Sequence, residues 1–255
     1  MIDIHSHILP AIDDGAQSLE DSLAMAKEAV REGIRAIIAT PHHKNGKYEN
    51  TKSSILQRTE QLNQFLKDEQ VDLKILPGQE PRIFGDLIED YRKGEVATLN
   101  NGGLYLFVEL PSNHVPRYTK QLLFDIQSER LTPIIVHPER NTELKENPDL
   151  LYEFVKNGTL TQLTAASISG RFGKNIQKFS HQMIEANLAH FVASDAHNIT
   201  SRSFKLNEAY DVIEKKFGID FVDLYLDNAE LLVEGKTVYK EVPEPIKKKR
   251  FLGVF

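Results

Sequence analysis

The chain has 255 residues, of which 40% are hydrophobic and 27% are charged, as is typical of a soluble globular protein with a substantial core. Its net charge of −6 argues against general nucleic-acid binding, because proteins of that class usually present a basic face. The absence of cysteine excludes disulfides, thiolate metal ligands and a cysteine nucleophile. No signal-peptide pattern or membrane-spanning apolar run is found, so we expect a cytoplasmic protein.

Short apolar runs alternate with amphipathic stretches along the whole chain. Ser18 is predicted to cap the first helix and Gly33 to end it, and the next helix is expected around residues 55–66. Further helices are expected within 115–130, 148–156, 174–186 and 204–217. The apolar face of the first helix is expected to consist of Leu19, Leu23, Ala26 and Val30. The predicted strands, continuous enough to be parallel and buried on both faces, are Ile2–Ile4, Ala36–Ala39, Leu73–Leu76, Tyr105–Val108, Ile134–Val136, Leu160–Leu163 and Phe191–Ala193.

Seven strand-then-helix units without a break in composition predict a single α/β domain, a closed barrel related to the eight-stranded TIM type. An open doubly wound sheet is the alternative. We expect this domain to cover residues 1–245, followed by a C-terminal tail over 246–255. The tail combines the basic cluster Lys247–Arg250 with an apolar tip. It is either a solvated, frayed end or a contact for a partner or a membrane surface.

Histidines and carboxylates gather where the predicted strands end. In barrels of parallel strands, active sites form at the carboxyl ends of the strands. His5 and His7 lie two residues apart in an extended run, so their side chains point to the same side. Six of the seven strand ends carry such a group, the sixth strand being the exception. The candidate metal ligands are His5, His7, Asp14, His42, Glu80, Glu109, His137, Asp195 and His197.

These ligand types predict a hydrolytic metal centre. Imidazoles and carboxylates without thiolates suit Mn, Fe, Zn, Co or Ni, and nine groups suggest two or three ions. Metals that share a bridging hydroxide and clamp a phosphate are common in phosphoester hydrolysis. Arg140 is expected to grip the phosphate, with Arg202 as a weaker second candidate and a salt bridge to Glu139 or Glu143 as the alternative for Arg140. His43 is left out because it should point away from His42.

The order and number of these motifs resemble the PHP (polymerase and histidinol phosphatase) superfamily. Within it, residues 2–10 (IDIHSHILP), Asp13-Asp14-Gly15, residues 39–43 (ATPHH) and Gly78-Gln79-Glu80 are similar to the manganese-dependent bacterial tyrosine-protein phosphatases of the YwqE and CpsB type. The resemblance covers nearly the whole chain. Many superfamily members have histidine in place of Asp14 and Glu109, a departure that counts against a histidinol phosphatase.

The resemblance implies a distorted seven-stranded barrel with a three-metal, manganese-loaded centre. His5, His7, Glu80 and Asp195 would hold one ion, Glu80, Glu109 and His137 the second, and Asp14, His42 and His197 the third. The implied activity is hydrolysis of phosphotyrosine by a metal-bridging hydroxide. The implied partner is the tail of a bacterial tyrosine kinase that controls capsule or exopolysaccharide synthesis. A small-molecule phosphoesterase of the histidinol-phosphatase kind, a non-catalytic phosphoprotein-binding module and a nuclease are the alternatives; the acidic balance counts against the last.

Overall fold

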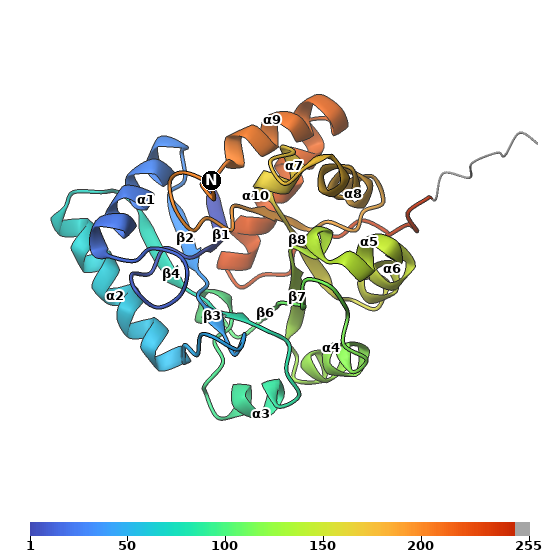
Figure 1. Ribbon diagram of the computed structural model, residues 1–255, viewed down its shortest axis with the longest axis horizontal. Helices are drawn as coiled ribbons and strands as arrows, with labels where there is room; N and C mark the ends of the chain where they lie inside the picture. The colour runs from blue at the N-terminus through green and yellow to red at the C-terminus, as the bar shows by residue number, and fades with distance from the viewer. Residues whose placement is uncertain (248–255) are drawn as a thin grey trace, which may run out of the picture.

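The structure is a computed structural model that describes residues 1–247. Its strands lie in the middle of the molecule with the helices around them (Figure 1). All seven expected strands are present, and the two-residue strands β3 and β5 bring the number within the described residues to nine instead of seven. The strands are β1 Ile2–Ser6, β2 Ala36–Ala39, β3 His42–His43, β4 Lys74–Pro77, β5 Glu80–Pro81, β6 Tyr105–Val108, β7 Thr132–Val136, β8 Leu160–Thr164 and β9 Phe191–Ala193.

The expected helices are present, together with several that the sequence analysis missed. Of these, α3, α5 and α7 are short, whereas α10 is a long helix whose buried Val222, Tyr225, Ala229 and Leu232 follow a helical spacing. Among residues 1–247, no helix is both long and apolar enough to cross a membrane. The helices are α1 Leu19–Arg31, α2 Lys52–Asp68, α3 Leu87–Arg92, α4 Thr119–Ser128, α5 Thr142–Glu146, α6 Pro148–Lys156, α7 Ala165–Ile168, α8 Lys174–Glu185, α9 Leu206–Phe217 and α10 Ile219–Val233, with 3₁₀ turns η1 Leu99–Asn101 and η2 Pro138–Arg140.

The ends of α1 match the prediction, but its expected apolar face is wrong in part. The Ser18 side chain accepts a hydrogen bond from the Asp21 backbone N–H, and Gly33 follows the helix with a φ of +80°. Leu19 and Val30 are 42% and 40% exposed. The buried stripe includes Ser22, a polar residue that the hydrophobic pattern did not predict to be buried. Its hydroxyl can be buried because it donates a hydrogen bond to the Ile8 carbonyl oxygen at 2.7 Å. This stripe consists of Ser22, Met25, Ala26 and Ala29.

The strands form three parallel sheets, with the orders β1-β2-β4, β3-β5 and β6-β7-β8-β9. Within the described residues, no sheet shows the reversal of strand order that an open doubly wound sheet requires. Isolated bridges join Ser6 to Ala196 and Arg82 to Glu109 at the carboxyl ends of the strands. The fold is therefore a parallel α/β domain whose three sheets meet where the candidate ligands lie, and the strand pairing by itself does not form one continuous closed barrel.

Both faces of the strands are covered by apolar side chains. Along β6, Tyr105 and Phe107 belong to one core cluster, and Leu106 and Val108 belong to the other. The larger cluster also contains side chains from most of the surrounding helices, and the smaller one includes Leu232 and other residues of the last helix. This double burial explains why the strands read as continuous apolar runs without alternation.

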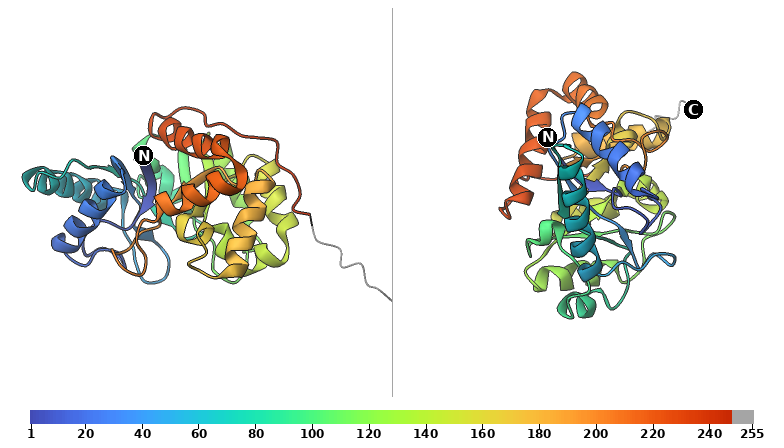
Figure 2. Two further views of the ribbon diagram at one scale, coloured as in Figure 1. Left: turned by 90° about the horizontal axis from the view of Figure 1, so that it is seen from above. Right: turned by 90° about the vertical axis from the view of Figure 1, so that its left-hand side faces the viewer.

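After α10 the chain runs along the outside of the molecule toward the C-terminus (Figure 2). The Glu244 N–H donates to the Ala186 carbonyl oxygen at 2.8 Å, and Ile246 is buried in the larger core cluster. The expected basic cluster at 247–250 and its apolar tip lie outside the described residues, apart from Lys247.

His190, just before β9, should make the fold sensitive to acid. Burial, with a smaller contribution from Lys240, lowers its pKa to about 3. In the unfolded chain His190 is protonated near pH 6.5, whereas in the folded chain it stays neutral down to about pH 3. The free energy of unfolding therefore falls as pH drops through this range. We expect wild type to lose ~1.4 kcal/mol more than His190→Gln between pH 7.5 and 5.5 in urea unfolding. Equal losses would show that His190 is not the group responsible.

Candidate metal centre

The nine candidate ligands lie together at the carboxyl ends of the strands. They come from β1, β3 and β5, from the segments just after β6, β7 and β9, and from the loop that follows β1. Two of them sit in the left-handed region of backbone conformation, with φ of +37° for His137 and +53° for Asp195. Their backbones are fixed by hydrogen bonds from the His137 N–H to the Gln162 carbonyl and from the Asp195 N–H to the His5 carbonyl. Such strained positions are typical of functional sites.

Two of the imidazoles are oriented by a partner on the far side of the ring. Nδ1 of His5 lies 2.9 Å from Oε1 of Gln162, whose amide nitrogen donates to the Leu163 carbonyl and so fixes the amide orientation. Nδ1 of His7 lies 2.7 Å from Oδ2 of Asp13. In the neutral form of each ring these acceptors favour the proton on Nδ1, which leaves the lone pair on Nε2, the atom that faces the cluster.

Several of the atoms that face the cluster are buried and lack a hydrogen-bond partner among residues 1–247. His197 has the same arrangement as the first two rings, because its Nδ1 lies 2.9 Å from the Asp195 carbonyl oxygen. The Nε2 atoms of the three rings lie 3.3 to 3.6 Å from the nearest carboxylate oxygens. Two ligands that are each ~2.1 Å from one ion would lie about 3.0 to 3.4 Å apart, so the spacing suits shared metal ions better than direct hydrogen bonds. The unpartnered atoms include His5 Nε2, His7 Nε2, His197 Nε2 and Glu80 Oε2.

Glu80 is the common contact of the cluster. Its side chain is fully buried, and its oxygens lie 2.8 Å from both His137 Nε2 and His42 Nδ1. They also lie 3.6 Å from His5 Nε2 and 3.4 Å from His7 Nε2. One carboxylate therefore faces four imidazoles from three different strand ends, as a bridging ligand would.

The structure shows three groups of closely spaced candidate ligand atoms. These groups share more residues than the three ligand sets that the resemblance implies. Three groups have ligand atoms within 4.8 Å of one another. His7 belongs to two of these groups, and His42 also belongs to two. The assignment of each residue to one ion stays a prediction. The groups are His7, Asp14, His42 and His197; His5, His7 and Glu80; and His42, Glu80 and Glu109.

The electrostatics of the site favour the metal-binding form of some of its side chains and not of others. Burial acts to lower the pKa of His7, but the Asp13 carboxylate outweighs it and raises this pKa. Burial, aided by the charge of Arg140, lowers the pKa of His137 to about 3, and burial lowers the pKa of His197 to about 4. Both rings are therefore neutral at pH 7, the form that binds a metal. Burial acts to raise the pKa of Glu80, but His42 and His5 outweigh it and hold this pKa well below its ordinary value.

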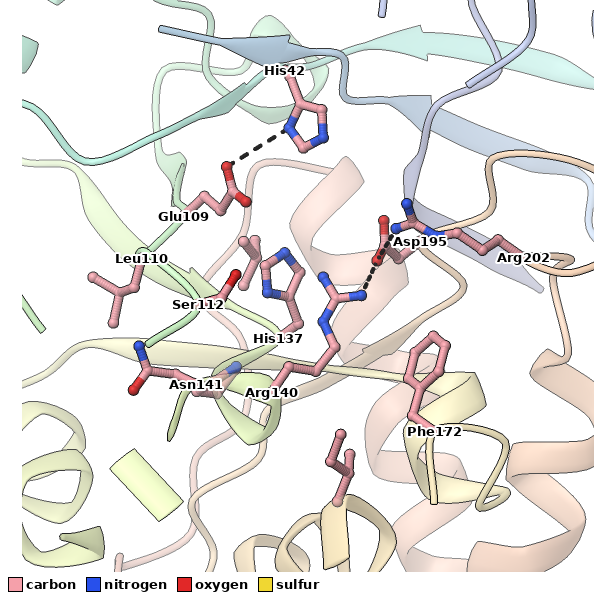
Figure 3. A pocket seen from close by; sticks show the side chains of 13 residues that line it. His42, Glu109, Leu110, Ser112, His137, Arg140, Asn141, Phe172, Asp195 and Arg202 are labelled. Atoms are coloured by element: carbon pink, nitrogen blue, oxygen red, sulfur yellow. Dashed lines mark hydrogen bonds and ion pairs between the residues drawn. The ribbon is translucent and has the colours of Figure 1, made fainter. Parts of the chain in front are cut away.

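Three arginines surround the cluster, of which the sequence analysis found two. Arg140 and Arg202 both donate to Oδ2 of Asp195, at 2.7 and 2.9 Å (Figure 3). Arg82, which was missed, makes a bidentate pair with Glu109 at 2.8 and 2.9 Å. The structure gives Arg140 this pairing with Asp195 in place of the surface salt bridge considered as the alternative.

Several supporting residues were also missed. Gln162 comes from the sixth predicted strand, which had seemed to contribute nothing, and a lone buried glutamine in an apolar strand was the available signal. Asp13 was overlooked beside Asp14. Gly15 allows the loop to approach His7 closely, since a Cβ there would lie 1.9 Å from the His7 carbonyl oxygen.

The remaining histidines lie apart from this cluster. His43 is buried with its ring edge-on to Phe84, which agrees with its expected direction away from His42. His114 is exposed, and His181 contacts Lys216. His190 accepts a hydrogen bond from the Thr161 N–H.

A cavity of about 570 Å³ opens beside the cluster (Figure 3). Its lining combines candidate ligands with both sequence-predicted arginines and several apolar side chains. A second cavity, of about 460 Å³, meets the cluster at Asp14 and His197 and includes Tyr48 and Ile199. The site is thus open to a substrate from two directions.

Comparison with known proteins shows that most of the chain matches one family and that its named relatives are tyrosine-protein phosphatases. The family described as capsular polysaccharide synthesis, CpsB/CapC, matches residues 1–234. The chain is 48% identical to the tyrosine-protein phosphatase YwqE of Bacillus subtilis, over 100% of both chains. It is 34% identical to the tyrosine-protein phosphatase CpsB of Streptococcus pneumoniae, over 93% of this chain and 100% of that protein.

The structure also superposes closely on a solved relative. A chain from the crystal structures of YwqE from Bacillus subtilis and CpsB from Streptococcus pneumoniae, described as unique metal-dependent tyrosine phosphatases, matches with a TM-score of 0.95. That match has 49% identity and covers 97% of this chain and 100% of the other. The chain therefore belongs to the CpsB/CapC family, whose relatives named here are tyrosine-protein phosphatases.

Proposed function

We propose that this chain is a metal-dependent protein-tyrosine phosphatase. The observation that carries the proposal is the set of buried, unpartnered imidazole nitrogens around Glu80, on rings that Gln162 and Asp13 orient from behind. A purely structural cluster would pair these atoms with one another, because an unsatisfied buried polar group costs ~1–3 kcal/mol. Membership of the CpsB/CapC family supports phosphotyrosine as the substrate.

The nine candidate residues fit two or three divalent ions, with Mn²⁺ as our choice. When bound, such ions generate a nucleophile from water and neutralise charge on the phosphoryl oxygens. The residues that would hold them are His5, His7, Asp14, His42, Glu80, Glu109, His137, Asp195 and His197. Since the chain has no cysteine, it cannot use the thiolate mechanism of other tyrosine phosphatases.

Arg140 and Arg202 would bind the phosphoryl group. Asp195 accepts one N–H from each guanidinium, so both side chains are held at the mouth of the cavity with their other N–H groups available to phosphate oxygens. Fixed donors of this kind stabilise negative charge that grows in the transition state. The phenol that leaves has a pKa of ~10, so it needs less help from a general acid than an alkyl alcohol does.

The fold, the physiological substrate and the cellular location of this chain can be proposed as well. We infer that the seven longer strands make a distorted barrel over residues 1–245, followed by a short tail. The substrate is the tyrosine-phosphorylated tail of a bacterial kinase that regulates capsule or exopolysaccharide synthesis, encountered in the cytoplasm. The family to which the chain belongs supports this setting.

Turnover of matched substrates with and without metal tests the function. We expect a phosphotyrosine peptide to be hydrolysed with a kcat/KM at least ~10-fold above that for histidinol phosphate. EDTA should abolish the activity and Mn²⁺ restore it, because the candidate ligands act through a bound ion. Iodoacetamide should have no effect. Activity that survives exhaustive chelation would refute the metal mechanism, and comparable turnover of both substrates would remove support for a protein substrate.

Glu80→Gln tests the central ligand. The amide keeps the size of the side chain but loses its charge, so we expect less bound metal per chain and a kcat lowered by more than ~100-fold, beyond the effect typical of outer-shell changes. Metal content by mass spectrometry, kcat and the circular dichroism spectrum measure this. Glu89→Gln is the matched control, since Glu89 is exposed and forms a surface ion pair with Lys93. Full metal content with normal kcat in Glu80→Gln would show that Glu80 is not a ligand.

A further inference from the structure

Two half-buried apolar side chains in the larger cavity have no structural role in the core. Phe172 and Ile176 line the cavity beside the candidate metal centre. Neither belongs to the two hydrophobic core clusters, nor to the partly buried side chains packed against them, among the described residues. Apolar surface kept open in a cavity with a few convergent polar groups is typical of a ligand-binding wall.

The loop between α7 and α8 holds Phe172 in place. Gly170, with a φ of +85°, precedes Arg171 and Phe172, and Gly173, with a φ of +94°, follows them. The Arg171 N–H donates to the Ala166 carbonyl at 2.9 Å, and the Gly173 N–H donates to the Gly170 carbonyl at 3.0 Å. This tight turn fixes the backbone that carries the aromatic ring toward the cavity.

The ring of Phe172 faces the phosphate-binding end of the cavity. Its centre lies 5.8 Å from the guanidinium carbon of Arg140, and the two side chains lie side by side in Figure 3. Arg140 and Arg202 converge on Asp195 just beyond this contact. The cavity therefore places an apolar aromatic surface next to two positive charges, which matches a phosphate ester of an aromatic alcohol.

We propose that Phe172, together with Ile176, binds the phenyl ring of the phosphotyrosyl side chain and sets the preference for aryl over alkyl phosphates. This inference rests on the proposed phosphatase function and deepens it. Phe172 and the substrate ring make an offset or edge-to-face contact while the phosphate lies at the arginines. A phosphoserine side chain is too short to reach this wall when its phosphate occupies the same place.

The second cavity is the competing position for the ring. It contains Tyr48 and Ile199, but the ring of Tyr48 is already stacked on His42, with centres 6.3 Å apart and planes 7° from parallel. Neither Arg140 nor Arg202 lines that cavity. The larger cavity is therefore the better place for an aromatic phosphate ester.

Phe172→Ala in the Mn²⁺-loaded enzyme tests the assignment. We expect KM for a phosphotyrosine peptide to rise about tenfold with kcat nearly unchanged. The lost contact with the substrate ring is equally strong in the bound substrate and in the transition state. The Kd of a non-hydrolysable phosphonate analogue of the same peptide, measured by calorimetry, should rise by the same factor. Phe172→Tyr should restore both values. Phe124→Ala, which removes an exposed phenylalanine of α4, is the matched control and should change neither.

Inorganic phosphate separates ring binding from an effect through Arg140. It has no ring, so its inhibition constant should be unchanged in Phe172→Ala, as should the low kcat/KM for a phosphoserine peptide. A weaker inhibition by phosphate, with kcat lowered for both peptides, would mean that Phe172 only positions Arg140. A rise in KM in Ile199→Ala but not in Phe172→Ala would place the ring in the second cavity. Either result overturns the inference, whereas failure of wild type to hydrolyse phosphotyrosine overturns the proposed function instead.

Discussion

A single buried carboxylate surrounded by imidazoles is the constraint on which the rest of the site depends. The oxygens of Glu80 lie between 2.8 and 3.6 Å from nitrogens of four histidines that come from three strand ends. Direct hydrogen bonds cannot satisfy all of these atoms at once, and several ring nitrogens are left unpartnered. Burying such a cluster is costly unless positive charge fills it. Divalent ions provide that charge, so the packing of the protein itself argues for a metal centre.

The fold supplies this cluster through its backbone as much as through its side chains. Parallel strands deliver their ends to one edge, and the short strands β3 and β5 carry His42 and Glu80 beyond the main sheets. His137 and Asp195, two further candidate ligands, have left-handed backbone conformations. Behind the rings, Gln162 and the loop before α1 fix the proton on the far nitrogen. The site is thus preorganised, which spares reorganisation when substrate binds.

The sequence predicted where the candidate ligands gather better than it predicted their surroundings. Residues such as His5 and His7 could be found because strand spacing alone places them on one side, and because five other strand ends carry similar groups. Arg82 and Gln162 could not be found in this way, because their roles depend on contacts between distant segments that no local pattern encodes. The buried face of α1 was misread for a related reason: Ser22 is buried only because its hydroxyl finds the Ile8 carbonyl. The three sheets are likewise joined by isolated bridges between segments that lie far apart in the sequence.

Anomalous diffraction from crystals grown with Mn²⁺ tests the central claim most directly, because it locates ions without reference to activity. The account predicts peaks within ~2.3 Å of the unpartnered nitrogens of His5, His7 and His197, with Glu80 between two of them. An active, well-ordered crystal with no anomalous peak among these residues would contradict it. The cluster would then be a structural network, and the phosphatase chemistry would have to be sought elsewhere on the molecule.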